Sequence, residues 1–281
     1  MKTKVFAIIL NYNNKRDTIE AALSLKNSDL GDNVGIIVID NGPVDQQKLF
    51  KKKIPGVSYI KSKKNVGFAA GNNRGIRCAL ELNATHILIM NPDVRVPKVF
   101  IKPLLNSFKM HKQAGIIAPA HQEPGNPLFG LGGHINWSNC TFPLDNTTKL
   151  PKNECEYDHL TFACVLIKAD VISKVGLLDE RYFMYLEDVD YCVRTINAGF
   201  KLLLNPRVCV THKTSSSFAD KRGKIKLSLS SCLKFIKKWY RFPNNIIPII
   251  HTLYFYPYTY LLWTLKLWKR KLTSASNKDR H

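Results

Sequence analysis

Residues 87–94 read ILIMNPDV, an apolar run that ends abruptly at Asn91, Pro92 and Asp93. Two earlier runs have the same character, VFAIIL at residues 5–10 and IIVI at residues 36–39. Short runs that are apolar at every position are typical of strands buried on both faces of a parallel sheet. These three stretches therefore predict the centre of an α/β domain.

The segments around these runs complete an alternating pattern. Residues 67–81 and 97–111 have helical spacing, and a further helix is predicted near Asp17, which has the spacing of a capping box with Glu20. The remaining strands are predicted at residues 57–60, 115–118, 201–204 and 208–211, the last two as a closing pair. Strands that alternate with helices predict an α/β fold.

Residues 121–160 interrupt this pattern with a stretch rich in proline and glycine. We expect an irregular segment here. A long loop inside a compact domain is often a functional lid or an acceptor loop.

Polar residues follow the predicted strands. Ligands of open α/β sheets bind beyond the carboxyl ends of the strands. Those ends carry Asn11, Tyr12, Asp40, Asn65, Gly67, Asn91 and Asp93. Turn chemistry explains any one of these ends, but four such ends together favour a shared site.

Two of these features have more than one interpretation. Asp93 follows a buried strand and a rigid proline, so its carboxylate can hold a hard divalent cation, with His212 as a candidate second ligand. Alone, however, Asp93 is weak evidence for a metal, and a lone histidine such as His212 is more often structural. Gly67, Gly71 and Gly75 share one helix face, which fits close helix–sheet packing and close approach to a ligand equally well.

The densest acidic cluster lies at residues 178–190. At about 100° per residue, Asp188 and Asp190 flank the apolar face of the following helix, and Glu187 is expected to point away. Acids favour helix N-termini in any case, and Asp190 has the spacing of an ion pair with Arg194. Asp188 is the best placed of these acids for general-base work.

Five strings occur in a fixed order over residues 4–215: ILNYN (9–13), VIDNGPVD (38–45), NVGFAAGNNRGI (65–76), ILIMNPDV (87–94) and YLEDVDYCVR (185–194). With them the chain resembles the inverting glycosyltransferases of family 2, in their rhamnosyltransferase-like branch. Each string alone is loose, but the five in order are specific. The resemblance implies a GT-A fold, a Rossmann-like nucleotide-diphospho-sugar transferase domain, over residues 1–215.

The resemblance also implies roles for single residues. The nucleotide-sugar site would include Asn11, Tyr12, Asp40, Asn65, Gly67 and Asn91, with Tyr12 and Asp40 on the pyrimidine nucleoside. Asp93 would bind Mg²⁺ or Mn²⁺ together with the diphosphate, and His212 would complete the metal site. Asp188 would be the catalytic base.

Two departures from the family pattern stand out. Asn91 replaces the first acid of the DxD motif, which leaves less charge on the metal and predicts a weaker metal dependence. Pro43 replaces the usual serine after Asp-Asn-Gly, a change that a turn tolerates.

The implied reaction is transfer of a sugar, with rhamnose as one candidate, from a dTDP- or UDP-sugar to a hydroxyl of a glycan acceptor. A lipid-linked acceptor in bacterial cell-surface polysaccharide synthesis is expected. The alternative is a non-enzymatic, basic scaffold that binds nucleic acid or membrane with a degenerate GT-A fold. Asp40, Asp93 and Asp188 favour the enzyme.

The net charge of +21 implies an anionic partner, which could be nucleic acid, an acidic membrane face or a phosphorylated substrate. Residues 221–281 hold 14 lysines and arginines against a single acid. Because the chain has no recognisable nucleic-acid-binding module, no nucleic acid partner is expected. An anionic membrane surface fits the basic tail better.

Residues 246–268 are mostly apolar and crowded with tyrosine and tryptophan, but they contain Pro248 and Pro257. These features favour a helical region lying in the membrane interface over a spanning segment, with packing onto the catalytic domain as a third option. Residues 216–281 are therefore predicted to be a basic, aromatic-rich, helical, membrane-associating region. The apolar run at residues 5–10 is too short for a signal-peptide core, and the seven scattered cysteines suit a reducing compartment. The expected location is cytoplasmic, peripheral on the inner face of the plasma membrane.

Overall fold

The structure is a computed structural model that describes residues 3–213 and 221–278. The chain forms two compact units. The first comprises residues 1–135, 142–183 and 187–214, and the second comprises residues 136–141, 184–186 and 215–281. The predicted boundary at residues 215 and 216 lies outside the described residues.

The first unit is built on a mixed sheet whose strands follow the order β3-β2-β1-β4-β10-β6-β11-β5. One half of the sheet is parallel, with β1 at its centre between β2 and β4. Its strands are β1 (Val5–Asn11), β2 (Val34–Asp40), β3 (Ser58–Lys61) and β4 (His86–Met90). The three apolar runs are therefore parallel strands, as predicted.

The other half of the sheet mixes directions. Strand β10 (Cys164–Lys168) runs antiparallel to both β4 and β6 (Ala114–Gln122). Strand β11 (Lys201–His212) is parallel to β6, and its end pairs with β5 (Val94–Arg95). The predicted closing pair of strands is wrong, because both stretches belong to β11. A register shift between Asn205 and Cys209 absorbs the polar interruption within that strand.

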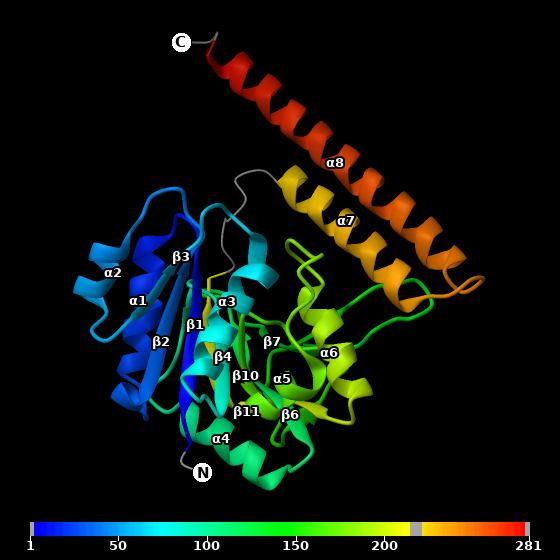
Figure 1. Ribbon diagram of the computed structural model, residues 1–281. Helices are drawn as coiled ribbons and strands as arrows, with labels where there is room; N and C mark the ends of the chain where they lie inside the picture. The colour runs from blue at the N-terminus through cyan, green and yellow to red at the C-terminus, as the bar shows by residue number, and fades with distance from the viewer. Residues whose placement is uncertain (1–2, 214–220, 279–281) are drawn as a thin grey trace. The chain divides into compact units, whose positions relative to one another are not determined.

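Helices cover both faces of the sheet (Figure 1). One apolar cluster joins the sheet to α1 (Lys15–Lys26), α2 (Gln47–Lys53) and α4 (Ile101–Met110). The opposite cluster joins it to α3 (Gly67–Glu81), α5 (Ala169–Val175) and α6 (Glu187–Asn197). Successive residues of β1 alternate between the clusters, with Ala7 in the first and Ile8 in the second. This doubly covered sheet confirms the predicted fold class.

The predicted capping box at the start of α1 does not form. The N-cap is Asn14, whose Nδ2 donates to Asp17 Oδ2 at 2.7 Å. Asp17 and Glu20 both accept from Arg95 Nη2, at 2.8 and 2.6 Å. The two acids tie α1 to β5 instead of capping the helix.

Residues 121–160 are more regular than predicted. They contain the end of β6, then β7 (Phe129–Gly133), β8 (Leu144–Thr147) and β9 (Cys155–Glu156). Strand β7 pairs antiparallel with β6 and β8. Its glycines look like loop residues in the sequence, but a Cβ at Gly130 or Gly132 would strike the ring of His121 or Tyr157. Glycine is therefore needed here for packing.

The second unit contains the helices α7 (Lys221–Trp239) and α8 (Ile246–Lys278), which lie side by side (Figure 1). Trp137 contacts Phe235 of α7, with ring centroids 6.0 Å apart. The sulfur atoms of Cys140 and Cys232 are 3.7 Å apart. Within the described part of the chain, no helix combines the length and apolar character needed to cross a membrane.

Candidate active site

The parallel strands deliver their polar end residues to one edge of the sheet. Asn11 and Asp40 are register partners at the ends of β1 and β2. Asn11 Nδ2 donates to Asp40 Oδ1 at 2.8 Å, and both side chains are buried. Asn91 directly follows β4, and its backbone N–H donates to Ala163 O at 2.8 Å, just before β10. The edge that the sequence predicts is therefore assembled.

Asp40 is the most heavily bonded residue of this edge. Its Oδ1 also accepts the N–H of Gly42 at 3.0 Å. On the other oxygen, the Tyr59 hydroxyl lies 2.8 Å from Oδ2 and Lys61 Nζ lies 3.8 Å from it. Burial, with Asp45 and Asp40 nearby, raises the pKa of Tyr59 above its usual value of 10.0. Tyr59 and Lys61, at the end of β3, contact Asp40 and were not among the residues predicted from the sequence.

The turn after β2 meets the start of α3. Asn41 Nδ2 donates to Gly67 O at 3.1 Å and approaches Asn65 Oδ1 at 3.4 Å, which also accepts the Gly67 N–H at 3.0 Å. Gly67 has a φ of 83°, and a Cβ there would collide with Phe183 O. Tyr12 directly follows β1 and is 49% exposed, so its ring is available to a ligand.

The other two glycines of α3 have a structural reason. A Cβ at Gly71 would strike Leu10, and a Cβ at Gly75 would strike Ile8. Close packing of α3 on β1 therefore explains both positions. Only Gly67 adds a backbone conformation that other residues rarely adopt.

Asp93 and His212 lie together, although 119 positions separate them in the chain. The pairing of β5 with β11 places His212 opposite Val94. His212 Nε2 is 3.3 Å from Asp93 Oδ1, a buried oxygen that accepts no well-formed hydrogen bond within the described structure. Asp93 is only 5% exposed. An oxygen without a donor beside an imidazole nitrogen fits a shared divalent cation.

This pair is a small ligand set. The described residues contain no group of three or more histidine, cysteine, aspartate or glutamate side chains suited to a metal. A cation here would need further oxygen ligands, which a diphosphate can supply. His121 stands nearby, with its ring centroid 6.0 Å from that of His212. Burial, assisted by His212, lowers the pKa of His121 to about 4, so this imidazole is neutral near pH 7.

Helix α6 brings the third part of the site. It follows Tyr185 and Leu186, which both adopt positive φ, at 71° and 64°. Left-handed backbone at bulky residues is costly and concentrates at functional sites. Asp188 lies in the first turn, and its Oδ1 accepts the N–H of Val189 at 2.9 Å.

The surroundings of Asp188 change its proton affinity. Burial raises the pKa of this carboxyl above its usual 3.8, while nearby His159 and the backbone N–H of Val189 oppose the rise. His159 is 3% exposed, and burial lowers its pKa below 6.5. A carboxylate with raised proton affinity is a better general base than an ordinary aspartate.

Glu187 is not directed to solvent, so that prediction is wrong. It is 5% exposed, and its Oε2 has no hydrogen-bond partner within the described structure. Burial, followed by the charge of Asp188, raises the pKa of Glu187 well above 4.5. The helical wheel assumed one buried face, but α6 buries seven of its residues on more than one side.

Asp190 has a structural role. It is fully buried, and Arg194 Nε donates to its Oδ2 at 3.0 Å, which confirms the predicted pair. Arg194 also donates to the carbonyls of Val175 and Leu177, both at 2.9 Å. This network fixes α6 against the segment after α5.

The edge of the sheet thus offers buried hydrogen-bonding groups and a carboxylate–imidazole pair, and helix α6 carries a carboxyl of raised pKa. The model of the family described as "Glycosyl transferase family 2" matches residues 6–176. The chain belongs to glycosyl transferase family 2. This result confirms the family-level resemblance seen in the five strings.

Curated relatives place the chain in a rhamnosyltransferase-like branch of the family. It is 28% identical over 212 residues to the low-salt glycan biosynthesis hexosyltransferase Agl10 of Haloferax volcanii, with 68% of this chain and 62% of Agl10 covered. It is 26% identical to the N-acetylglucosaminyl-diphospho-decaprenol L-rhamnosyltransferase of Mycobacterium tuberculosis, covering 66% and 68%. It is 24% identical to the dTDP-rhamnosyl transferase RfbF of Shigella flexneri, covering 80% and 73%. The chain therefore spans less than two thirds of the length of Agl10.

Solved structures show the same fold at low identity. A mannosyltransferase from Pyrobaculum calidifontis, in complex with GDP-Man and Mn²⁺, superposes with a TM-score of 0.61 at 12% identity, covering all of this chain and 81% of the other. GalNAc-T7 with UDP, GalNAc and Mn²⁺ superposes with a TM-score of 0.65 at 13% identity, covering 85% and 48%. The fold is that of the GT-A glycosyltransferases.

Proposed function

We propose that this glycosyltransferase moves a sugar from a dTDP- or UDP-sugar to a glycan hydroxyl with inversion at the anomeric carbon. The observation that carries the proposal is the meeting of Asp93 with His212 at the sheet edge that also holds Asp40. Asp188 supplies a carboxyl of raised pKa in the first turn of α6. The names of the Mycobacterium and Shigella relatives make rhamnose the first donor sugar to test.

Each residue has a defined task in this mechanism. Tyr12 contacts the nucleoside with its exposed ring. The hydrogen bond between Asn11 and Asp40 holds the ends of β1 and β2 in place beside it. Asn65 and Gly67 fix the backbone beside the nucleotide, and Asn91 precedes the metal-binding acid. Asp188 accepts the proton of the acceptor hydroxyl while that oxygen attacks the anomeric carbon. One displacement with the base on the acceptor side gives the inverted product.

A divalent cation, Mg²⁺ or Mn²⁺, would be held by Asp93 and His212. When bound, it supplies Lewis-acid stabilisation of the leaving diphosphate. The neutral amide of Asn91 places less negative charge beside the cation than an aspartate would, so we expect modest metal affinity without nucleotide. A bound diphosphate would supply the further oxygen ligands that the cation needs.

The second unit supports a membrane location. Apolar side chains recur on α8 every three or four residues, and each is at least 44% exposed. They are Ile246, Ile247, Ile250, Leu253, Tyr254, Phe255, Tyr258, Leu261, Leu262 and Leu265. An apolar stripe in a strongly basic segment is typical of helices that lie in the interface of an anionic membrane. We therefore place the enzyme on the cytoplasmic face of the membrane, acting on a lipid-linked glycan.

Thermal unfolding with nucleotide sugars tests the proposal. A donor present at about 100 times its dissociation constant raises the free energy of unfolding by about 2.7 kcal/mol. For a domain of this size that shift raises the Tm by roughly 5–10 °C. We expect stabilisation by a dTDP- or UDP-sugar that is larger with Mn²⁺ than without it. If no nucleotide sugar of a broad panel raises the Tm with either metal, the proposed function is wrong.

A further inference from the structure

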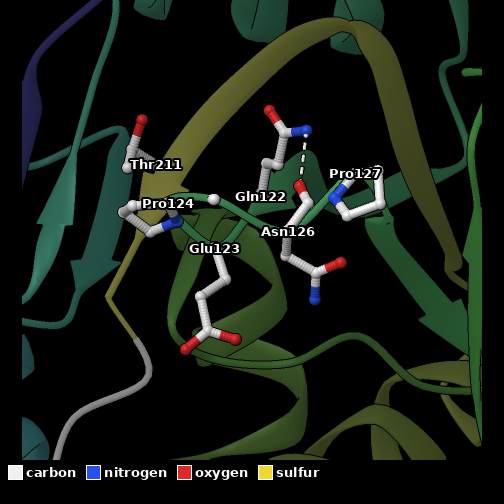
Figure 2. Close-up of a pocket in the computed structure, with 7 residues that line it drawn as sticks. Gln122, Glu123, Pro124, Asn126, Pro127 and Thr211 are labelled. Atoms are coloured by element: carbon white, nitrogen blue, oxygen red, sulfur yellow. Dashed lines mark hydrogen bonds between the residues drawn. The ribbon is translucent and has the colours of Figure 1, made fainter.

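A hollow of about 410 Å³ lies at the turn between β6 and β7, lined by residues 122–127 and Thr211. Figure 2 shows that the side chains of Gln122 and Glu123 point in opposite directions and that the lining groups do not converge on one position. Ligand sites are built from polar groups that converge on the ligand. This hollow therefore does not indicate a site, and the more informative geometry lies in the segment before α6.

The chain makes a strained turn just before α6. Tyr185 and Leu186 are consecutive bulky residues with positive φ, at 71° and 64°. Such backbone is costly for side chains of this size, so it persists only where the surrounding contacts hold it. Asp188, the proposed base, follows Leu186 by two positions. The contacts that hold this turn therefore also determine where the first turn of α6, with Asp188, is placed.

Helix α7 supplies two of these contacts. Ser231 is buried, and its Oγ donates to Met184 O at 2.9 Å. Lys224 Nζ lies 5.5 Å from the centre of the Tyr185 ring, within the range of a cation–π contact. Seven positions separate Lys224 from Ser231, which is about two helical turns, so both lie on one face of α7. Residues 184–186 belong to the same compact unit as α7.

The segments on either side of the turn are held by other contacts. Phe183 O accepts the N–H of Phe68 at 2.7 Å, at the start of α3. On the other side, Arg194 binds Asp190 and two carbonyls after α5, which fixes the later part of α6. Between these fixed points lie residues 184–186 and the first turn of α6. Any relaxation of the strained turn is therefore taken up where Asp188 lies.

We propose that Ser231 and Lys224 are positioning residues for sugar transfer, because they hold the turn at residues 184–186 and thereby keep Asp188 in its productive place. The inference rests on the proposed function, since it takes Asp188 as the base. Both residues act through the backbone before α6 and not on the reacting atoms. A displacement of about 1 Å at a catalytic group can cost roughly 10²-fold in rate. Helix α7 then contributes to catalysis in addition to its part in the membrane-associating unit.

Hydrogen exchange of the full chain, followed by mass spectrometry, tests the link without any substrate. Ser231→Ala removes the donor to Met184 O with little change in volume. Exchange at residues 185–190 should become roughly threefold to tenfold faster, because the net worth of one hydrogen bond then favours local opening. The matched control is Ser230→Ala, the same change at the exposed neighbouring residue of α7, which should exchange like the parent. Equal exchange in the two variants would overturn the inference.

Release of nucleotide diphosphate from the donor sugar tests the consequence for catalysis. For Ser231→Ala, kcat should fall roughly threefold to tenfold while the KM for donor stays within about twofold of the parent. Lys224→Met should lower kcat about twofold to fivefold, the worth of an exposed cation–π contact. Its matched control is Lys226→Met, which removes the same charge and a contact of the same length, 5.5 Å from Lys226 Nζ to the centre of the Tyr260 ring on α8. This control should keep the parental kcat.

The outcomes of the kinetic experiment are distinct. Parental kcat in Ser231→Ala, or a raised KM with unchanged kcat, would overturn the inference, because the residue would then serve stability or donor binding alone. Equal losses in Lys224→Met and Lys226→Met would overturn it for Lys224 and leave charge as the cause. If the parent itself releases no nucleotide diphosphate from any donor, the proposed function fails, and the role assigned to Ser231 fails with it.

Discussion

Replacement of Asp188 by asparagine removes the proposed base with little change of shape. The asparagine Oδ1 can still accept the Val189 N–H that Asp188 accepts at 2.9 Å. The amide cannot take a proton from the acceptor hydroxyl. General-base catalysis is worth about 10²–10⁴-fold, so kcat should fall by that factor, while the affinity for donor stays within about twofold of the parent.

The direction in which Asp188→Asn changes stability can be predicted. Burial raises the pKa of Asp188 above 3.8, so the folded state disfavours the ionised form. Ionised Asp188 therefore costs stability in full above its folded pKa. This cost shrinks as the pH falls below that value and is gone below the unfolded pKa, near the usual 3.8. Asp188→Asn should unfold at the same temperature as the parent or higher at pH 7.5. A catalytic loss with unchanged or raised Tm cannot come from misfolding.

The pH–rate profile gives the same residue a second test. The base must be ionised, so kcat/KM should fall on the acid side with an apparent pKa above that of an ordinary aspartate. The matched control is Asp170→Asn, an exposed acid in the first turn of α5, which should keep full activity. If Asp188→Asn retains most of the parental turnover, Asp188 is not the base. Glu187, buried beside it, then becomes the residue to examine.

Three other changes probe separate parts of the account. In calorimetry, Mn²⁺ should no longer raise the affinity of Asp93→Ala for nucleotide diphosphate. If Mn²⁺ raises that affinity as much as it does in the parent, Asp93 is only a turn residue. Tyr59→Phe removes the hydroxyl 2.8 Å from Asp40 Oδ2, and an unsatisfied buried acceptor costs about 1–3 kcal/mol, so the Tm should fall by roughly 2–12 °C. An unaltered Tm would mean that this hydroxyl does not stabilise the fold. Leu261→Glu should lower sedimentation of the protein with anionic vesicles more than Ser230→Glu does. Ser230→Glu makes the same charge change at an exposed residue of α7. If both variants lower sedimentation equally, the charge change alone is the cause.

Much of the active-site edge could be predicted because parallel strands impose it. Once residues 5–10, 36–39 and 87–94 are recognised as buried parallel strands, Asn11 and Asp40 must end at the same edge. The Asp93–His212 contact needs more, because it depends on the pairing of β5 with β11. From the residues alone His212 was only a candidate second ligand, and the resemblance to the family pointed to the same pair.

Other residues around the predicted site gave no signal in the sequence. Tyr59 and Lys61 reach Asp40 because β3 is the outer neighbour of β2, and strand order is not visible in one sequence. His159 stands near Asp188 because a glycine at residue 133 leaves space for its ring. Glu187 was misplaced because a helical wheel represents one buried face, and α6 has more than one. Each failure concerns a long-range contact and not local propensity.

The central claim is that this site breaks the bond between a sugar and a nucleotide diphosphate. Incubation of the full chain with a panel of nucleotide sugars and Mg²⁺ or Mn²⁺, followed by quantification of released nucleotide diphosphate and NMR of the sugar, tests it directly. We predict slow, enzyme-dependent release from a dTDP- or UDP-sugar, with an inverted anomeric centre in the first product and no release by Asp188→Asn. Release with retained configuration, or equal release by Asp188→Asn, would contradict the account.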